Sequence, residues 1–96
     1  DSVFVPNTFT PNGDGINDYF IPLGLAINKI VHFQVYNRWG ELIYSEENIT
    51  PESANQGWDG KFNGTEVQEG VYIYTAEIEY LSGIITQLKG NITLIK

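Results

Sequence analysis

The segment from Pro11 to Asp18, PNGDGIND, holds the residues whose types and spacing are best suited to chemistry. Asn12, Asp14 and Asp18 present side-chain oxygens at short intervals along it. The glycines between them let the backbone turn tightly enough to aim these oxygens, together with the carbonyl of Ile16, at one centre. Oxygen atoms are the ligands that calcium prefers in proteins. The candidate metal ligands are therefore Asn12, Asp14, Ile16 and Asp18, and the candidate cofactor is calcium.

A second interpretation of the same segment needs no ion. Asn and Asp side chains commonly hold backbone N–H groups in Asx turns, and a glycine-rich loop between two strands offers such groups. Calcium takes about six to eight oxygen ligands, whereas this loop alone offers about four or five, so Asn17, Asp59 or water would have to complete the shell. The loop is also too short for an EF-hand and lacks its closing glutamate. Both interpretations stay open on the sequence.

Catalytic chemistry finds little support elsewhere in the chain. The only histidine, His32, shares an expected strand face with Gln34, where an ordinary surface histidine is the simpler interpretation. Cysteine is absent, which excludes a disulfide framework and a zinc site with thiolate ligands. Glu77 and Glu79 fall on one exposed strand face, where solvated charge is commoner than a hydrolytic pair of carboxylates. We therefore expect that the chain is not an enzyme.

The charge balance restricts the class of partner. The 96 residues include 12 acidic and 5 basic side chains, which gives a net charge of −7. Nucleic acids and anionic membrane surfaces are bound through clustered Lys and Arg, whereas the basic residues here are scattered. The sequence also contains no apolar run long enough to cross a bilayer. We expect neither a nucleic-acid partner nor direct insertion into a membrane.

The elements that position these residues are expected to be strands, because β-branched and aromatic residues are plentiful while 10 glycines and 4 prolines interrupt the chain. The expected strands are Val3 to Pro6, Tyr19 to Leu23, Ile30 to Tyr36, Leu42 to Ser45, Gly70 to Tyr80 and a last one after the turn at Ser82 and Gly83. Loops are expected at Thr8 to Asp18 and Glu46 to Gln56, and tight turns at Asn37 to Glu41, Asp59–Gly60 and Asn63–Gly64. This predicts an all-β fold, an Ig-like antiparallel β-sandwich of about seven strands.

Alternation within the strands predicts which side chains are buried. Val31, Phe33 and Val35 should face the core, and so should the even-numbered residues from Tyr72 to Tyr80. Trp39 and Trp58 each stand beside a turn, where a tryptophan commonly caps a small core; exposure for docking is the alternative.

The chain is expected to form one domain, since its length suffices for a single small core. It begins at Asp1 inside an expected strand and ends at Lys96 directly after another. We therefore expect residues 1–96 to be a C-terminal domain excised from a larger protein, with any export signal upstream.

Five motifs in order resemble one protein family. They are FTPNGDGIND at Phe9 to Asp18, VYNRWGELIY at Val35 to Tyr44, WDG at Trp58 to Gly60, GVYIY at Gly70 to Tyr74 and GNITLIK at Gly90 to Lys96. The family is the gliding motility-associated C-terminal domain, the type B sorting domain of the type IX secretion system of Bacteroidota. The WDG and GVYIY motifs are also similar to Ig-like domains of the flagellar hook-capping type, so they support the fold more than the function.

The resemblance implies a sorting domain at the end of a large adhesin, enzyme or motility protein. Such a domain directs its passenger from the periplasm across the outer membrane to the cell surface or the medium. The implied partners are the type IX translocon and an outer-membrane protein of the PorP/SprF kind. We expect the domain to meet them as a monomer.

Three surfaces are candidates for recognition by these partners. The first is the last strand, Leu88 to Lys96, whose terminal position should leave it free for capture by strand addition. Its candidate residues are Leu88, Lys89, Asn91, Thr93, Ile95 and Lys96. The PNGDGIND loop is the second candidate, and the NRWG hairpin with Arg38 and Trp39 is the third. In each case the alternative is that the residues only determine the fold.

Competing functions follow from the same sequence. The main one is an Ig-like surface module whose tryptophans and tyrosines bind a carbohydrate or a protein, which an exposed coplanar row of aromatic rings would favour. A passive spacer between other domains is a further alternative.

Overall fold

The structure, a computed structural model, describes residues 2–13, 15, 18–53 and 57–96. In these residues the chain is all β and contains no helix that could cross a membrane. The strands are β1 (Ser2–Phe4), β2 (Thr8–Phe9), β3 (Leu23–Leu25), β4 (Ile27–Tyr36), β5 (Leu42–Ile49), β6 (Lys61–Phe62), β7 (Thr65–Glu66), β8 (Gly70–Tyr80) and β9 (Ile85–Leu94).

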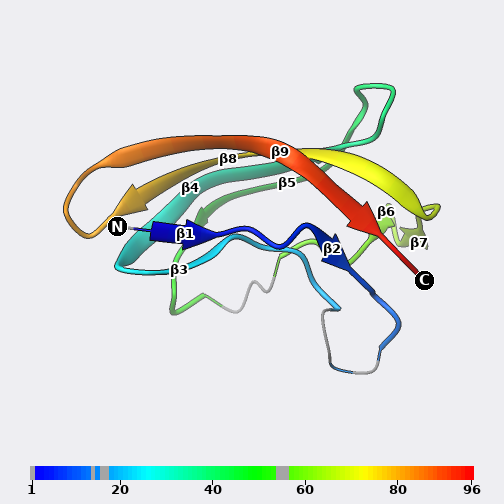
Figure 1. The fold of residues 1–96 in the computed structure, drawn as a ribbon, viewed down its shortest axis with the longest axis horizontal. Coiled ribbons are helices and arrows are strands. Elements are labelled where there is room, and N and C mark those ends of the chain that lie inside the picture. Colours follow the sequence, from blue (N-terminus) through cyan, green and yellow to red (C-terminus); the bar gives the residue numbers. More distant parts are fainter. Residues whose placement is uncertain (1, 14, 16–17, 54–56) are drawn as a thin grey trace.

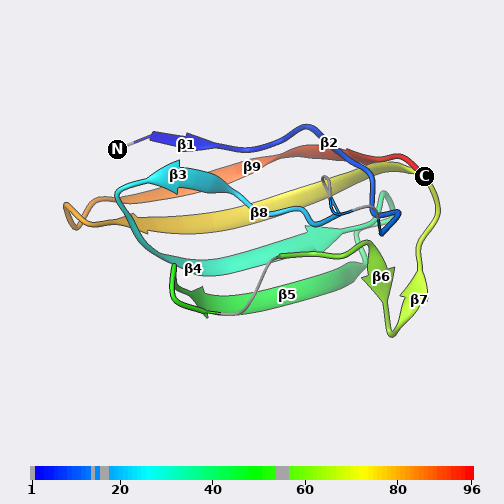
Figure 2. The same cartoon turned by 90° about the horizontal axis from the view of Figure 1, so that it is seen from below.

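A five-stranded sheet forms one layer of the molecule, with the strand order β2-β9-β8-β4-β5 (Figures 1 and 2). Its neighbours are antiparallel except for β2, which pairs with β9 in parallel. The facing layer contains the antiparallel ribbon β1-β3 and the bridge between Phe20 and Trp58. The short hairpin β6-β7 lies at one end of the sheet (Figure 2). The predicted all-β class is confirmed, and the layers are compatible with an Ig-like sandwich.

The core lies between the two layers and is rich in aromatic rings. Along β8 every even-numbered residue from Tyr72 to Tyr80 is buried, as the alternation predicts. Trp58 is fully buried, its ring packs against Phe9 and Tyr72, and its indole N–H donates to the carbonyl of Lys61 at 3.0 Å. Trp58 therefore caps the core as predicted, with the polar atom of its buried ring satisfied.

One glycine makes this arrangement possible. Phe20 and Trp58 exchange two backbone hydrogen bonds of 2.8 and 2.9 Å, which draws the two segments close together. Gly57 precedes Trp58 with φ of 106°, and a Cβ on it would clash with the Phe20 carbonyl and stand 2.7 Å from the Cβ of Ile21. Only glycine adopts this conformation without steric cost, so Gly57 allows the facing layer to close over the sheet.

The structure corrects several predicted boundaries. Strand β5 continues to Ile49, into a segment predicted to be a loop. Thr8 and Phe9 form a short strand instead of starting a loop, and the strand predicted at Tyr19 begins only at Leu23. These misses share a cause, because short or edge strands need not bury one face regularly and so lack a clear alternation.

Val31 is only half-buried, contrary to prediction, whereas Ile30 is buried. The pairing of β4 with β8 shifts register between Ile30 and His32. Such an irregularity breaks the period of two, so the inward position falls on Ile30.

Candidate functional site

The PNGDGIND loop is organised around the carboxylate of Asp18. One of its oxygens accepts hydrogen bonds from the backbone N–H groups of Asn12 at 3.1 Å and Gly13 at 3.0 Å. The other oxygen accepts from Gly15 at 2.7 Å. Gly13 and Gly15 have φ of 80° and 81°, which turn their N–H groups toward the carboxylate at no steric cost. Asp18 thus anchors the loop backbone through its side chain, but its donors precede it in the chain, whereas an Asx turn is closed by the N–H two residues later.

The candidate calcium ligands are only partly described. Asp14 and Ile16 lie outside the described residues, and so does Asn17, one of the residues that would have to complete the shell. Among the residues that the structure describes, no group of three or more His, Cys, Asp or Glu side chains is placed to hold a metal ion. A carboxylate offers about four lone-pair positions, and Asp18 already uses three for backbone N–H groups. The hydrogen-bonded turn therefore accounts for the described contacts of this loop without an ion.

The NRWG turn, Asn37 to Gly40, presents Arg38 and Trp39 on a braced support. The side-chain oxygen of Asn37 accepts from the N–H groups of Trp39 at 2.9 Å and Glu41 at 3.0 Å, and its NH₂ donates to the Glu41 carboxylate at 2.9 Å. Trp39 is 80% exposed, and the Arg38 guanidinium lies 5.1 Å from its ring centroid. The core-capping role predicted for a turn-adjacent tryptophan is therefore wrong for Trp39, whose ring faces solvent with a cation above it.

A pocket of about 170 Å³ opens beside this turn. Arg38, Trp39 and Glu41 line one part of it, and residues of the loop before β8 and the first residues of β8 line another. The hydroxyl of Tyr72 in this wall donates to the carbonyl of Gln68 at 2.6 Å. Burial raises the pKa of Tyr72, while the positive charge of Arg38 offsets part of this rise. The Arg38 guanidinium thus acts on the pocket as well as on Trp39.

The C-terminal residues lie at the same end of the sheet as the NRWG turn (Figure 1). The reason is register, since Tyr36 at the end of β4 pairs with Ile73, and Gly70 at the start of β8 pairs with Leu94. The backbone N–H of Lys96 donates at 2.7 Å to the carboxylate of Glu69, a residue of the pocket wall. Four predicted recognition residues, Arg38, Trp39, Ile95 and Lys96, therefore share one end of the domain, which we call the Trp39 end.

The other recognition residues of β9 are distributed along the strand. Leu88, Lys89 and Asn91 lie in its middle, away from the Trp39 end. The prediction that the last strand is free throughout is wrong for its final part, because Thr93 and Leu94 pair with β2. The N–H groups of Thr93 and Ile95 donate to the carbonyls of Asn7 and Phe9, both at 3.0 Å. The chain's own N-terminal segment thus occupies this part of the edge.

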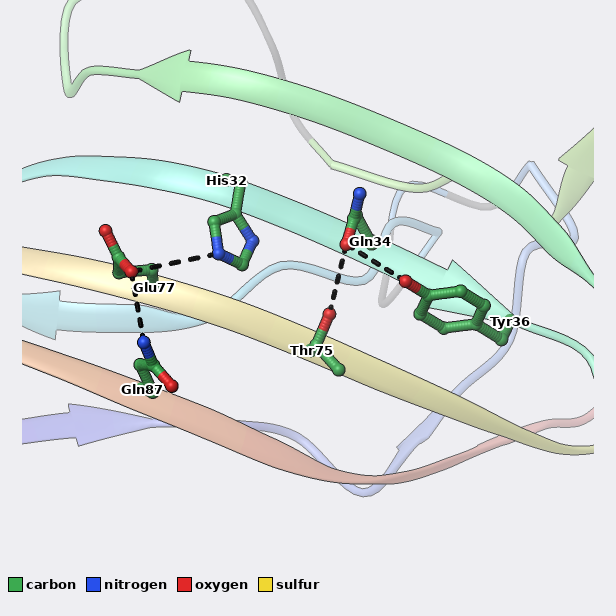
Figure 3. A network of polar contacts seen from close by, with 6 residues as sticks. All are labelled: His32, Gln34, Tyr36, Thr75, Glu77 and Gln87. Carbon is green, nitrogen blue, oxygen red and sulfur yellow. Dashed lines mark hydrogen bonds and ion pairs between the residues drawn. The ribbon is translucent and has the colours of Figure 1, made fainter. Parts of the chain in front are cut away.

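The outer face of the five-stranded sheet carries a polar ladder that runs across three strands (Figure 3). His32 of β4 lies 3.9 Å from the carboxylate of Glu77 on β8, which in turn accepts from Gln87 of β9 at 3.3 Å. The side-chain oxygen of Gln34 accepts from Tyr36 at 3.0 Å and from Thr75 at 3.4 Å. His32 is accordingly a partly exposed side chain whose Nε2 has a cross-strand carboxylate partner, while its buried Nδ1 has no hydrogen-bond partner among the described residues.

The ladder and the pocket were not foreseen in the sequence. Cross-strand pairs depend on register, and the sequence shows only that His32 and Glu77 both lie on outward positions. The pocket unites residues that are about thirty positions apart, which local spacing cannot reveal. The exposed tryptophan in the NRWG turn was the one local signal.

Comparison with known proteins identifies a family for this chain. Residues 3–94 match the family model CHU_C, described as a type IX secretion signal domain. No curated protein matches the chain. The family match covers almost the whole sequence, including the loop anchored by Asp18, the NRWG turn and strands β8 and β9.

Proposed function

The chain belongs to the CHU_C family of type IX secretion signal domains, and on this premise we propose how it is recognised during export. The family fixes the general function, a C-terminal sorting signal that acts with the type IX secretion machinery. It also implies export toward the cell surface or the medium. The family is not an enzymatic one. The match over residues 3–94 is the observation on which this function depends.

The finer steps are our proposal. The passenger reaches the periplasm by its own N-terminal signal, and the folded domain, as a monomer, then docks on an outer-membrane protein of the PorP/SprF kind. Because the net charge is −7, direct attraction to an anionic membrane surface would be unfavourable, which supports a protein partner. Calcium binding by Asn12, Asp14, Ile16 and Asp18 remains a separate hypothesis about the stability of the loop.

We propose that docking uses the Trp39 end. Tryptophan and arginine are the residues most enriched among those that dominate binding energy at protein interfaces. Trp39 is exposed and its turn is braced by Asn37, so little conformational entropy is lost when a partner covers the ring. Arg38 and Lys96 are two of only 5 basic residues, and both belong to this end of the sheet. They would therefore favour a partner surface with carboxylates.

The competing interpretation, a surface module that binds carbohydrate through aromatic rings, is not favoured. Trp58 and the tyrosines at 72, 74 and 80 are buried in the core and cannot stack on a ligand. Trp39 and Tyr19 are exposed, but they belong to separate loops. The aromatic residues thus serve mainly to fill a small sandwich.

A reporter experiment tests the sorting function. Residues 1–96 are fused behind a periplasmic signal peptide and a fluorescent protein and expressed in a host with the type IX machinery. Reporter in the medium or on the surface is expected, and it should stay in the periplasm of a strain that lacks the machinery. Reporter retained in the periplasm of both strains would contradict the sorting function.

The docking surface is tested in the same fusion. Trp39→Ala and Arg38→Ala should each lower export, by about tenfold for the tryptophan, as for a residue at the centre of an interface. Ile84→Ala is the matched control, because Ile84 is also exposed but lies in the β8–β9 turn at the opposite end of the sheet. Equal export by the Trp39 and Ile84 variants would place docking elsewhere while leaving the sorting function intact.

A further inference from the structure

We propose that the open edge of β9, residues 85–91, is a strand-pairing site for an extended segment of an outer-membrane component of the export machinery. This inference rests on the sorting function and adds a second contact to the Trp39 end. It names the kind of partner group, a protein backbone in the β conformation.

The direction of the backbone groups follows from the contacts of β2. Within a strand, the N–H and C=O of one residue point to the same side, and alternate residues point to opposite sides. The N–H groups of Thr93 and Ile95 point toward β2, because they donate to Asn7 and Phe9. The pairing of β8 with β9 runs without a register shift from Gly70 and Leu94 to Glu79 and Ile85. The same parity therefore extends back along the strand.

Gln87, Lys89 and Asn91 consequently aim their backbone N–H and C=O groups at the side where β2 has already ended. Strand β2 pairs only with Thr93 and Leu94, and β1 pairs with β3 in the facing layer. Among the described residues, no strand pairs with β9 on this side between Ile85 and Ile92. Figure 2 shows β9 as the outer long strand of the sheet on this side. Unpaired groups of this kind are a template for a further strand.

The opposite edge of the same sheet is protected against such pairing. Strand β5 carries the adjacent charges Glu46 and Glu47, both exposed, and Asn48 has a positive φ of 54° that interrupts the extended backbone. Its pairing with β4 also shifts register at Val35. Charges and irregularities are the usual means by which proteins blunt an edge. Strand β9 pairs regularly over its whole length, so only one edge of this sheet is suited to accept a strand.

The charge on this edge indicates the chemistry of the partner. Lys89 is the only charged residue between Ile85 and Asn91, it is exposed, and the structure shows no carboxylate within ion-pair distance of it among the described residues. An added strand with an acidic side chain opposite Lys89 would form a cross-strand pair of opposite charge. Backbone pairing would supply affinity, and this pair with the exposed Ile85 would supply selectivity.

Amide hydrogen exchange tests the inference directly. In the chain alone, the N–H groups of Gln87, Lys89 and Asn91 should exchange faster than those of Thr86 and Leu88, which face β8. The chain is then mixed with detergent-solubilised outer membranes from a host that has the type IX machinery, and with membranes from a strain that lacks it. With membranes that contain the machinery, exchange at Gln87, Lys89 and Asn91 should slow about tenfold or more, corresponding to about 1.4 kcal/mol. With membranes that lack the machinery, it should not slow. No slowing at these amides with the machinery present, in a chain that still exports its reporter, would refute edge pairing and leave the sorting function standing.

Proline substitutions supply an independent arm. Gln87→Pro and Asn91→Pro remove donors that face the open edge and leave the hydrogen bonds to β8 in place, as at edge positions that tolerate proline. Gln87→Ala and Asn91→Ala remove the same side chains but keep the donors. Urea unfolding first identifies the proline variants that remain folded. In these variants, export should fall about tenfold relative to the matching alanine variants. Equal export by the proline and alanine pairs would contradict the inference.

Other occupants of the edge are distinguished by concentration. Slowed exchange at these amides without membranes, increasing with the concentration of the chain, would assign the edge to a second copy. If exchange at these amides is already slow without membranes and does not depend on concentration, the edge is occupied by the chain's own N-terminal segment. Either result would overturn the proposal.

Discussion

The carboxylate of Asp18 accepts a hydrogen bond of 2.7 Å from the backbone N–H of Gly15, three residues earlier in the chain. Two further backbone groups bond to the other oxygen of the same side chain. Bonds from N–H groups to an ionised acceptor are stronger than bonds between neutral groups. The loop that contains the family motif FTPNGDGIND is therefore held by its last residue.

Replacing Asp18 should loosen this loop and destabilise the domain. Asp18→Ala removes the acceptor of the Gly13 and Gly15 N–H groups, whereas the N–H of Asn12 also donates to the Thr10 carbonyl at 2.8 Å. By analogy with lost capping side chains, the variant should cost about 1–2 kcal/mol of unfolding free energy. Asp18→Asn keeps one acceptor oxygen and should cost less. Urea unfolding in the presence of EDTA measures both variants, and unchanged stability of Asp18→Ala would show that these bonds contribute nothing net.

The same variants separate the two interpretations of the loop. If hydrogen bonds alone hold it, the midpoint of thermal unfolding of the unmodified chain should be the same in EDTA and in millimolar calcium. A bound ion would instead raise the midpoint with calcium concentration, and Asp18→Asn would abolish that rise. The first outcome would remove calcium as a cofactor, and the second would establish it.

Gly57 should be among the least replaceable residues outside the core. Gly57→Ala adds a Cβ that meets the backbone of Phe20 at a φ of 106°, so both strain and a steric clash oppose it. We expect a loss of about 2–4 kcal/mol in unfolding free energy, because the clashing atoms belong to backbone and cannot move aside cheaply.

The matched control for this variant is Gly64→Ala. Gly64 also has a positive φ, 79°, but nothing lies within 4 Å of the position where its Cβ would be. Gly64→Ala should therefore lower the unfolding free energy only by the cost of placing an L-residue at a positive φ, about 1–2 kcal/mol. Equal losses of unfolding free energy in the two variants would mean that the clash with the Phe20 backbone adds no destabilisation.

How much the sequence predicts depends on how regularly an element buries its side chains. Strand β8 has neighbours on both sides and one face on the core, and its alternation from Tyr72 to Tyr80 predicts its burial correctly. Strand β5 is an edge strand, and its polar residues Glu46 to Asn48 are tolerated because neither of their faces must be buried. The alternation of apolar and polar residues reports burial and not backbone pairing. The sequence therefore predicts a loop where β5 is paired but exposed.

The candidate sites show a similar division. The motifs identify the family, and Trp39 is recognisable as a turn tryptophan that could be exposed. The meeting of Glu69 with the backbone of Lys96, and the parity that opens the β9 edge, follow only from the register of long-range pairs. The role of Asp18 as an acceptor for backbone groups was one of two possibilities, because Asp and Asn supply oxygen to an ion and to an N–H group alike.

A strained alanine between β3 and β4 gives a prediction of opposite sign. Ala26 has φ of 62°, a conformation that costs an L-residue about 1–2 kcal/mol, whereas glycine adopts it freely. Its carbonyl accepts from the N–H of Leu81 at 2.7 Å, and glycine can keep this bond. After the extra entropy that glycine loses on folding, Ala26→Gly should raise the free energy of unfolding by about 0.5–1 kcal/mol.

Urea denaturation of Ala26→Gly should be compared with that of Ala76→Gly, whose site is buried in the regular strand β8. The second change has no strain to relieve and should destabilise the domain by about 0.5–1 kcal/mol or more, since it also removes a packed methyl group. Destabilisation by both changes would show that the turn at Ala26 stores no strain.

Alkaline pH should destabilise the domain through its buried tyrosines. Burial raises the pKa of Tyr74 above its ordinary value of 10.0, and it does the same for Tyr72. Folding therefore favours the protonated phenol, so this contribution to stability is complete below pH 10 and is lost as the pH rises through the folded pKa. Tyr74→Phe keeps the ring that packs on Phe20 and removes the titrating hydroxyl. Unfolding free energies measured by urea from about pH 9 to pH 12 should fall less steeply for Tyr74→Phe than for the unmodified chain, and identical slopes would exclude Tyr74 as a source of the alkaline loss.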